Sequence, residues 1–305
     1  MTIRSETLFV DVEPDVRICV ERWPATSADA PTVLALHGFS SNRLVFAGLA
    51  KAFDGSVEVI AVDCRSRGQS SNPEDPARYG MRRHADDVAA VLRSLQRRDV
   101  VVVGTSMGAW IATQVAAHHS DLVRGLVLVD GGYLDLLPAG TDPVDYVNGV
   151  LQGGLDHLDM VIPDLELAIG VAKQSPGLSP IWDADLEVSL REGYRPVDGG
   201  VRNRLSRSAA AADATSYNDP IDNPYLRQDI AAISCPAHLI TAPLGLPMDA
   251  ATFAPPIMSP TAIDELRATL PQLTVERTAG ENHFSVCIGE ASNAMVVPAV
   301  RRLLS

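Results

Sequence analysis

Residues 100–108, Val-Val-Val-Val-Gly-Thr-Ser-Met-Gly, constrain the fold more than any other stretch of this sequence. Four consecutive valines predict a strand that is buried on both faces. The helical pattern of residues 109–118 follows at once, so strand and helix must be joined by a sharp turn that contains Ser106. Glycines at 104 and 108 have no Cβ and allow the strand and the helix to approach closely. We therefore predict that Ser106 stands on this turn with its hydroxyl exposed, as the candidate nucleophile.

Apolar runs of the same kind recur along the chain and are separated by helical patterns. Residues 7–12 and 16–23 are β-rich, and the turn sequence Glu13-Pro14-Asp15 between them predicts a hairpin. Residues 82–96 repeat apolar side chains at helical spacing. This alternation predicts an α/β fold with a mostly parallel, doubly wound sheet. The core strands are expected at residues 32–36, 57–62, 100–103, 125–129, 237–241 and 273–276.

The strand and helix rhythm stops between the sixth and seventh strands. Residues 133–231 are rich in proline, contain glycine pairs at 153–154 and 199–200, and show helical pieces at 185–192 and 202–212. They contain no strand-like run of the core type, so we predict a helical cap domain inserted there. The core domain then consists of residues 1–132 and 232–305.

Composition narrows the range of partners. The formal net charge is −13, and a surface of this charge repels phosphate backbones and anionic lipids. We expect a small-molecule substrate and no nucleic-acid or membrane partner; the oligomeric state is not readable. The start of the chain has no basic segment followed by an apolar run, and its four cysteines are scattered. These features favour a cytoplasmic protein without a metal site or a cofactor.

A serine hydroxyl needs a neutral imidazole to take its proton. Of the seven histidines, His283 is placed in a loop after the last strand candidate, downstream of every other element. His84 is on a helix of surface type, and His238 is inside a strand, where a core role is expected. We therefore predict His283 as the general base.

The turn after the predicted strand at 32–36 is expected to lie near Ser106. Residues 33–36 run into His37-Gly38-Phe39, a turn that can present the Phe39 backbone N–H to the site. The Met107 N–H, at the start of the helix after Ser106, is the second predicted donor. Two such donors form an oxyanion hole, which stabilises the charge that develops on a carbonyl oxygen during acyl transfer. His37 itself is expected to be a structural turn residue.

With these motifs the chain resembles the α/β-hydrolase superfamily over essentially its whole length. Residues 63–70, Asp-Cys-Arg-Ser-Arg-Gly-Gln-Ser, resemble the D-x-R-G-x-G-x-S segment of that family, with Ser66 where the family usually has glycine. The resemblance implies a nucleophile–acid–histidine order along the chain and a cap between strands six and seven. It also implies a structural role for Asp63.

The third member of the triad has two candidates. The family usually carries the acid after strand seven, where the only acid here is Asp249, seven residues beyond the predicted strand end. Asp130 follows strand six directly and precedes two glycines, at the sheet edge where catalytic groups of open α/β sheets gather. We favour Asp130 and keep Asp249 as the alternative.

These residues predict a serine hydrolase that cleaves an ester or lactone of a small, largely apolar substrate through an acyl-enzyme intermediate. Hydrolysis of a thioester, an amide or the carbon–carbon bond of a diketone on the same triad is the alternative, and a non-hydrolytic ligand-binding relative is a further one. Trp182 and Tyr133 are the candidate substrate contacts. Together with them, the aromatic residues that could line a pocket under the cap are Tyr146, Tyr194, Tyr217 and Tyr225.

Overall fold

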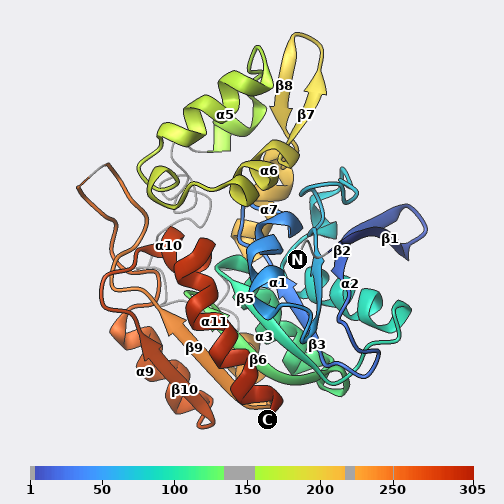
Figure 1. The fold of residues 1–305 in the computed structure, drawn as a ribbon, viewed down its shortest axis with the longest axis vertical. Helices are drawn as coiled ribbons and strands as arrows, with labels where there is room; N and C mark the ends of the chain where they lie inside the picture. The colour runs from blue at the N-terminus through green and yellow to red at the C-terminus, as the bar shows by residue number, and fades with distance from the viewer. Residues whose placement is uncertain (1–3, 134–154, 217–223, 250) are drawn as a thin grey trace.

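An eight-stranded sheet forms the centre of the protein in a computed structural model that describes residues 4–133, 155–216, 224–249 and 251–305 (Figure 1). The strand order is β1-β2-β4-β3-β5-β6-β9-β10. β1 and β2 form the expected hairpin, β2 pairs antiparallel with β4, and all other neighbours in this sheet are parallel. The bounds are β1 Glu6–Glu13, β2 Val16–Trp23, β3 Thr32–Leu36, β4 Glu58–Val62, β5 Val100–Thr105, β6 Val123–Val129, β9 Ala237–Thr241 and β10 Leu273–Arg277.

Helices cover both faces of this sheet, which explains why its central strands are apolar throughout. Alternate strand residues such as Val33 and Ala35 pack against α1 (Ala47–Phe53) and α11 (Gly289–Leu304). Their neighbours Leu34 and Leu36 belong to the core on the other face. That face is covered by α2 (Met81–Ser94), α3 (Met107–His118), α8 (Pro224–Ala232) and α9 (Pro260–Thr269). The predicted α/β fold with a doubly wound, mostly parallel sheet is confirmed.

The chain between β6 and α8, called the inserted segment below, supplies the elements beyond the carboxyl ends of the parallel strands. In Figure 1 α5, α6 and the hairpin β7–β8 occupy the top of the view. The described elements are η4 (Leu155–Asp159), α5 (Leu165–Gln174), η5 (Ser179–Ile181), α6 (Ala184–Glu192), β7 (Tyr194–Val197), β8 (Gly200–Asn203) and α7 (Arg207–Ser216). The division into a core domain and a cap at 133–231 stays a prediction, part of which falls on residues 134–154 and 217–223, outside the described residues.

The hairpin corrects the expectation of a purely helical segment. β7 and β8 pair antiparallel around Gly199 and Gly200, whose φ angles of +82° and +149° suit glycine. Because residues 200–203 are extended, the helix predicted at 202–212 begins only at Arg207. Short paired strands without an alternating apolar pattern cannot be distinguished from turns by periodicity.

Polar contacts fasten the inserted segment to the core. The Asn42 amide donates to the Ser189 carbonyl oxygen over 2.7 Å, and the Ser189 hydroxyl donates to Asn42 Oδ1 over 3.1 Å. Ser66 Oγ accepts the Ser206 N–H over 2.9 Å. Ser66 has a φ of +64°, in the left-handed region that favours glycine. This conformation explains why the family that the chain resembles usually has glycine at this position.

Among the described residues, no helix combines the length and the apolar character that crossing a membrane requires.

Glu58 at the start of β4 gives a prediction for acid stability. Burial by itself would raise the pKa of Glu58, but hydrogen bonds from Arg97, Arg22 and Thr32 outweigh it and lower the pKa to about 2 from 4.5. Because the pKa of Glu58 is lower in the folded protein than in the unfolded protein, the ionised carboxylate stabilises the fold at pH values above the unfolded-state pKa. This stabilisation is lost as the pH falls towards 2. Glu58→Gln should therefore lower the free energy of unfolding at pH 7 by about 2 kcal/mol.

Urea unfolding from about pH 7 down to about pH 3 measures this effect, because the Gln variant should lose less stability on acidification than the wild type. Glu6→Gln is the matched control, since Glu6 contacts the same Arg22 but its side chain is 53% exposed. Equal acid slopes for the wild type and Glu58→Gln would contradict the prediction.

Candidate active site

Ser106 stands on the turn between β5 and α3, with a φ of +50° and a ψ of −120°. The two flanking glycines make this turn possible. A Cβ on Gly104 would lie 2.2 Å from the Gly108 carbonyl oxygen, and a Cβ on Gly108 would lie 2.0 Å from the Leu36 carbonyl oxygen. A left-handed conformation at a non-glycine residue costs free energy and persists where the surrounding structure fixes it. The strand–turn–helix junction predicted from the sequence is present.

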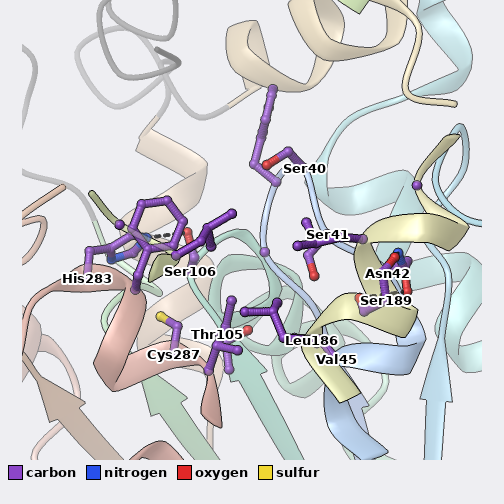
Figure 2. A pocket seen from close by; sticks show the side chains of 18 of the residues that line it. Ser40, Ser41, Asn42, Val45, Thr105, Ser106, Leu186, Ser189, His283 and Cys287 are labelled. Carbon is purple, nitrogen blue, oxygen red and sulfur yellow. Dashed lines mark hydrogen bonds between the residues drawn. The ribbon is translucent and has the colours of Figure 1, made fainter. Parts of the chain in front are cut away.

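Ser106, His283 and Asp130 form a continuous hydrogen-bonded chain. His283 Nε2 lies 3.1 Å from Ser106 Oγ (Figure 2), and His283 Nδ1 lies 2.7 Å from Asp130 Oδ2. Asp130 directly follows β6, is fully buried, and accepts hydrogen bonds at Oδ1 from the Thr241 hydroxyl and the Ala242 N–H. Both carboxylate oxygens are therefore occupied, which holds the carboxylate in one orientation.

His283 is the first residue of the short helix α10 (His283–Cys287), which refines the expected loop position. Asn282 caps this helix, and its side chain and that of Ser285 form a reciprocal capping box. The His283 N–H also donates to the Gly245 carbonyl oxygen over 3.2 Å. The imidazole therefore extends from a backbone that is fixed on both sides.

Asp249 lies away from this chain. It is exposed, and its Oδ1 accepts the backbone N–H groups of Ala251 and Thr252 over 2.8 and 2.9 Å. Its carboxylate thus serves its own turn, and the geometry at His283 is provided by Asp130. His238 has the expected core position, with Nδ1 2.7 Å from Thr274 Oγ1 and Nε2 3.2 Å from Glu276 Oε2.

The turn after β3 lies against Ser106. A Cβ on Gly38 would be 3.3 Å from Ser106 Cβ. His37 is fully buried, and burial lowers its pKa to about 3, so the ring is neutral. It donates from Nδ1 to the Gly38 carbonyl oxygen over 2.7 Å and accepts the Cys64 N–H at Nε2 over 3.1 Å. His37 is thus a structural residue of the turn that carries Phe39.

Ser106 and His283 open into a cavity of about 370 Å³ between the sheet edge and the inserted segment. Phe39, the predicted oxyanion donor, is part of its wall, and Met107 follows Ser106 as the first residue of α3. Figure 2 shows Ser40, Ser41 and Asn42 along the wall, with Ser189 of α6 beside Asn42. None of the described residues that line the cavity is Lys, Arg, Asp or Glu. The apolar wall includes Val45, Trp110, Leu178, Leu186, Leu190, Leu246, Ile257 and Phe284.

The two candidate substrate contacts are not in this wall. Tyr133 is buried in the core and its hydroxyl donates to Glu265 Oε2 over 2.9 Å, and Trp182 lies under Lys173 Nζ at 5.5 Å from the ring centroid. Tyr194 does line the cavity. Tyr146 and Tyr217, and the side chain of Tyr225, lie outside the described residues. Aromatic character alone could not separate core from wall, because both environments favour these side chains.

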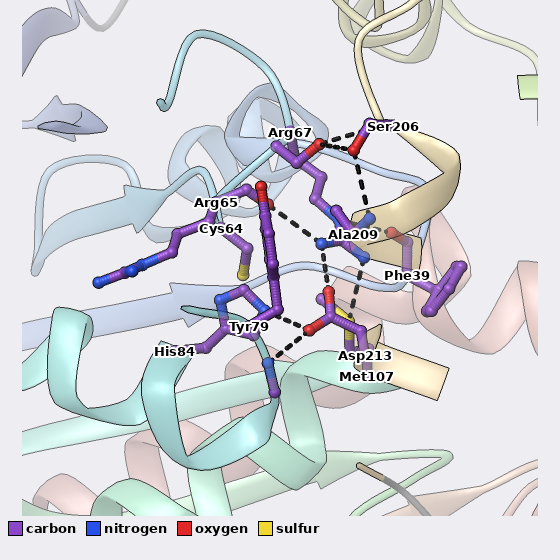
Figure 3. Close-up of polar contacts among 12 residues, drawn as sticks. Phe39, Cys64, Arg65, Arg67, Tyr79, His84, Met107, Ser206, Ala209 and Asp213 are labelled. Carbon is purple, nitrogen blue, oxygen red and sulfur yellow. Dashed lines mark hydrogen bonds and ion pairs between the residues drawn. The ribbon is translucent and has the colours of Figure 1, made fainter. Parts of the chain in front are cut away.

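The segment after β4 contains residues that sequence reasoning missed. Asp63 has the expected structural role, since it is fully buried and accepts hydrogen bonds from Arg43 and Gln69. Arg67, by contrast, forms a buried ion pair with Asp213 of α7 (Figure 3). A second arginine in the variable part of the D-x-R-G-x-G-x-S pattern was the available signal. His84 corrects the expectation of a surface histidine, because it is buried and its Nε2 lies 2.9 Å from Asp213 Oδ1.

In the described part of the chain, no group of three or more His, Cys, Asp and Glu side chains is arranged to hold a metal ion.

Comparison with known proteins finds relatives of this chain. A model of the α/β-hydrolase fold matches residues 31–174. The chain is 28% identical over 277 residues to a 2-(acetamidomethylene)succinate hydrolase of Mesorhizobium japonicum, covering 90% of this chain and 88% of the relative.

Solved structures agree over nearly the whole chain. The crystal structure of E-2-(acetamidomethylene)succinate hydrolase superposes with a TM-score of 0.76 at 23% identity, covering 99% of both chains. A thioesterase domain from the curacin biosynthetic pathway gives a TM-score of 0.76 at 19% identity, covering 98% of this chain and 99% of that one. An N-formylmaleamic acid deformylase from Pseudomonas putida S16 gives 0.66 at 21%, covering 95% and 100%. With this fold and these relatives, the protein is a hydrolase with the α/β-hydrolase fold.

Proposed function

We propose that the protein hydrolyses an ester of a small, uncharged and largely apolar substrate through an acyl-enzyme intermediate on Ser106. The observation that supports this most strongly is the Asp130–His283–Ser106 hydrogen-bonded chain, whose serine end opens into the cavity. A serine hydroxyl, a histidine and a fixed carboxylate in this order are the parts that acyl transfer requires.

In the proposed reaction, Ser106 Oγ attacks the ester carbonyl while His283 Nε2 takes the hydroxyl proton. The carbonyl oxygen becomes negative and accepts hydrogen bonds from the Phe39 and Met107 N–H groups. The tetrahedral intermediate then expels the alcohol, which receives the proton from His283. A water molecule attacks the acyl-serine by the same route, and the carboxylic acid leaves. Asp130 keeps His283 Nδ1 protonated, so Nε2 is free to accept.

The charge of the cavity limits the substrate. None of the described side chains that line the cavity belongs to Lys or Arg, and the sequence of residues 134–154 and 217–223 contains neither residue type; the side chain of Arg227 lies outside the described ones. The whole chain has a net charge of −13. An unpaired carboxylate in such a cavity would lose its hydration without gaining a cation, which costs several kcal/mol. The name of the relative from Mesorhizobium japonicum contains a succinate, a dicarboxylate. We infer that this chain takes a different, uncharged acyl group.

A matched pair of esters tests both the reaction and the charge preference. p-Nitrophenyl methyl adipate and p-nitrophenyl hydrogen adipate share the leaving group and the chain length, and differ in one negative charge. We expect kcat/KM to be about 100-fold higher for the methyl ester, equivalent to about 2.7 kcal/mol. If neither ester is hydrolysed faster than in buffer alone, the proposed ester hydrolysis is overturned. Equal kcat/KM values would overturn only the charge preference.

Leu190 offers a way to change that preference. It lines the cavity from α6. Leu190→Arg should add a cation and reduce the 100-fold preference by about tenfold or more, because an arginine pairs with a carboxylate in bidentate geometry. Leu190→Met is the matched control of similar size without charge. A preference that is unchanged in Leu190→Arg would count against the argument from charge.

Hydrolysis of an amide is the second candidate, because the names of two similar proteins contain an acetamido group and a maleamic acid. The same nucleophile and base serve both bonds, but an amide needs stronger protonation of its leaving nitrogen by His283. Hexanoyl p-nitroanilide and p-nitrophenyl hexanoate have the same acyl group, so comparing their rates distinguishes amide hydrolysis from ester hydrolysis. A kcat for the anilide within about tenfold of that for the ester would favour amide hydrolysis.

A further inference from the structure

The guanidinium of Arg67 touches both residues that are expected to supply the oxyanion donors. Its side chain is 1% exposed. Nε donates to the Phe39 carbonyl oxygen over 3.0 Å, and Nη2 lies 3.7 Å from Met107 Sδ. The guanidinium carbon also lies 5.2 Å from the centroid of the Phe39 ring. Figure 3 shows the Arg67 guanidinium next to Phe39, with Asp213 and Met107 also beside it.

The two peptide planes on either side of Phe39 are thus each held by a buried side chain. The preceding plane contains the Gly38 carbonyl and the Phe39 N–H, and its oxygen accepts from His37 Nδ1 over 2.7 Å. The following plane contains the Phe39 carbonyl, which accepts from Arg67. Because a trans peptide directs its C=O and N–H to opposite sides, the bond from His37 orients the Phe39 N–H. The bond from Arg67 holds the following plane, so Phe39 is fixed at both of its peptide bonds. Phe39 follows β3 and has no strand ladder to do this, whereas Met107 is held by α3.

Asp213 holds the Arg67 guanidinium in place. It is fully buried on α7 and pairs with Arg67 Nη1. It also accepts the Gly80 N–H over 2.8 Å and a hydrogen bond from His84 Nε2 over 2.9 Å. Burial would raise the pKa of Asp213, but His84 and Arg67 outweigh it and hold this pKa well below its ordinary value. A buried ion pair with this many hydrogen bonds has one preferred geometry.

We propose that Arg67 is a positioning residue of the oxyanion site, and that Asp213 on the inserted segment holds it in place. This inference rests on the proposed function, because the oxyanion hole is part of that mechanism. It means that the site is complete only while α7 is docked on the core.

The chain contains a matched control for this proposal. Arg65, two residues earlier, forms an equally buried pair with Asp87, with Nε and Nη2 each 2.6 Å from a carboxylate oxygen. The other partners of its side chain are Glu13 and the Arg78 carbonyl oxygen, and no contact joins it to Phe39 or Met107 among the described interactions. Its backbone carbonyl oxygen accepts from Arg67 Nη1 over 3.1 Å, a bond that Arg65→Lys leaves in place. Breaking either pair should destabilise the fold to a similar degree. Only the Arg67 pair should affect catalysis.

The experiment compares Arg67→Lys and Arg65→Lys in the full chain. A lysine keeps the charge, but its single nitrogen cannot reproduce the planar fork that reaches Phe39 and Asp213 together. For Arg67→Lys we expect kcat for p-nitrophenyl methyl adipate to fall about 30-fold, with KM within about threefold of the wild type. The Ki of an alkyl trifluoromethyl ketone, which forms an oxyanion on Ser106, should rise by the same factor as kcat/KM falls. Arg65→Lys should lower Tm similarly while kcat and Ki stay within about threefold.

Arg67→Lys with kcat and Ki within threefold of the wild type would overturn the proposal, as would an equal fall of kcat in Arg65→Lys. If Arg67→Lys does not fold, Asp213→Asn decides the matter. It leaves Arg67 in the chain without its counter-charge, and we expect a loss of about fivefold to tenfold in kcat with a parallel rise in Ki. Unchanged kcat and Ki in Asp213→Asn would then overturn the proposal. A wild type that turns over no ester would instead overturn the proposed function, so the two failures are distinguishable.

Discussion

Ser106→Ala should lower kcat for p-nitrophenyl methyl adipate by at least about 10³-fold without changing the fold. The substitution removes the attacking oxygen and leaves the backbone N–H groups of the oxyanion site in place, so a small residual rate should remain. Position 106 has a φ of +50°, and serine and alanine both carry a Cβ, so we expect the strain of this turn to change little. Equal Tm values and a rate measured by release of p-nitrophenolate check this expectation.

A fluorophosphonate should label the wild type on Ser106 and leave Ser106→Ala unlabelled. Ser94→Ala is the control, because Ser94 is exposed at the end of α2 and should leave the labelling unchanged. His283→Ala should be about as damaging as Ser106→Ala, since nucleophile and base act as one unit. An adduct on another serine, or activity of Ser106→Ala within a few-fold of the wild type, would refute the mechanism.

Asp130→Asn should lower kcat by up to about 10⁴-fold while the fold is kept. Asp130 has a φ of +46°, which asparagine tolerates well. At Oδ1 it receives two donors, the Thr241 hydroxyl and the Ala242 N–H. The amide oxygen of asparagine must take that position, which turns its NH₂ group towards His283 Nδ1. The imidazole then carries its proton on Nε2 and cannot accept the proton of Ser106.

Asp249→Asn is the matched variant for this test, with the same chemical change on an exposed turn. We expect it to cost no more than about tenfold in kcat. Both variants should be assayed side by side on the same ester. A crippled Asp249→Asn together with a nearly normal Asp130→Asn would assign the acid to the loop after β9. Mild effects in both would mean that a different group orients the imidazole.

The core strands, and their alternation with helices along the chain, could be predicted from local sequence. The largely apolar runs at 32–36 and 237–241 coincide with β3 and β9 residue for residue, because strands that are buried on both faces are rich in apolar side chains. The hairpin β7–β8 could not, since Tyr194–Val197 and Gly200–Asn203 are only partly buried and show no alternation. Its pairing depends on contacts such as the bridge between Ile162 and Val201, which is distant in sequence.

The histidines show the same division. His283 could be singled out because its position after the last strand is a property of chain order. The burial of His84 could not, since its neighbours on α2 include charged residues on the exposed face. What buries it is Asp213, which is 129 residues away in the sequence and approaches on α7. A hydrogen bond between residues so far apart in the chain leaves no periodic signal in either segment.

By itself the sequence determined the α/β core and the serine turn, because apolar periodicity and the two glycines act over a few residues. It also identified Ser106, His283 and two possible acids as candidates for the catalytic triad. Only the tertiary structure decided between these acids geometrically, since the choice depends on which carboxylate lies within 2.7 Å of His283 Nδ1. It likewise decided which side chains form the cavity and which arginine supports Phe39. Both depend on where the inserted segment packs, and that packing is the sum of many contacts between residues far apart in the chain.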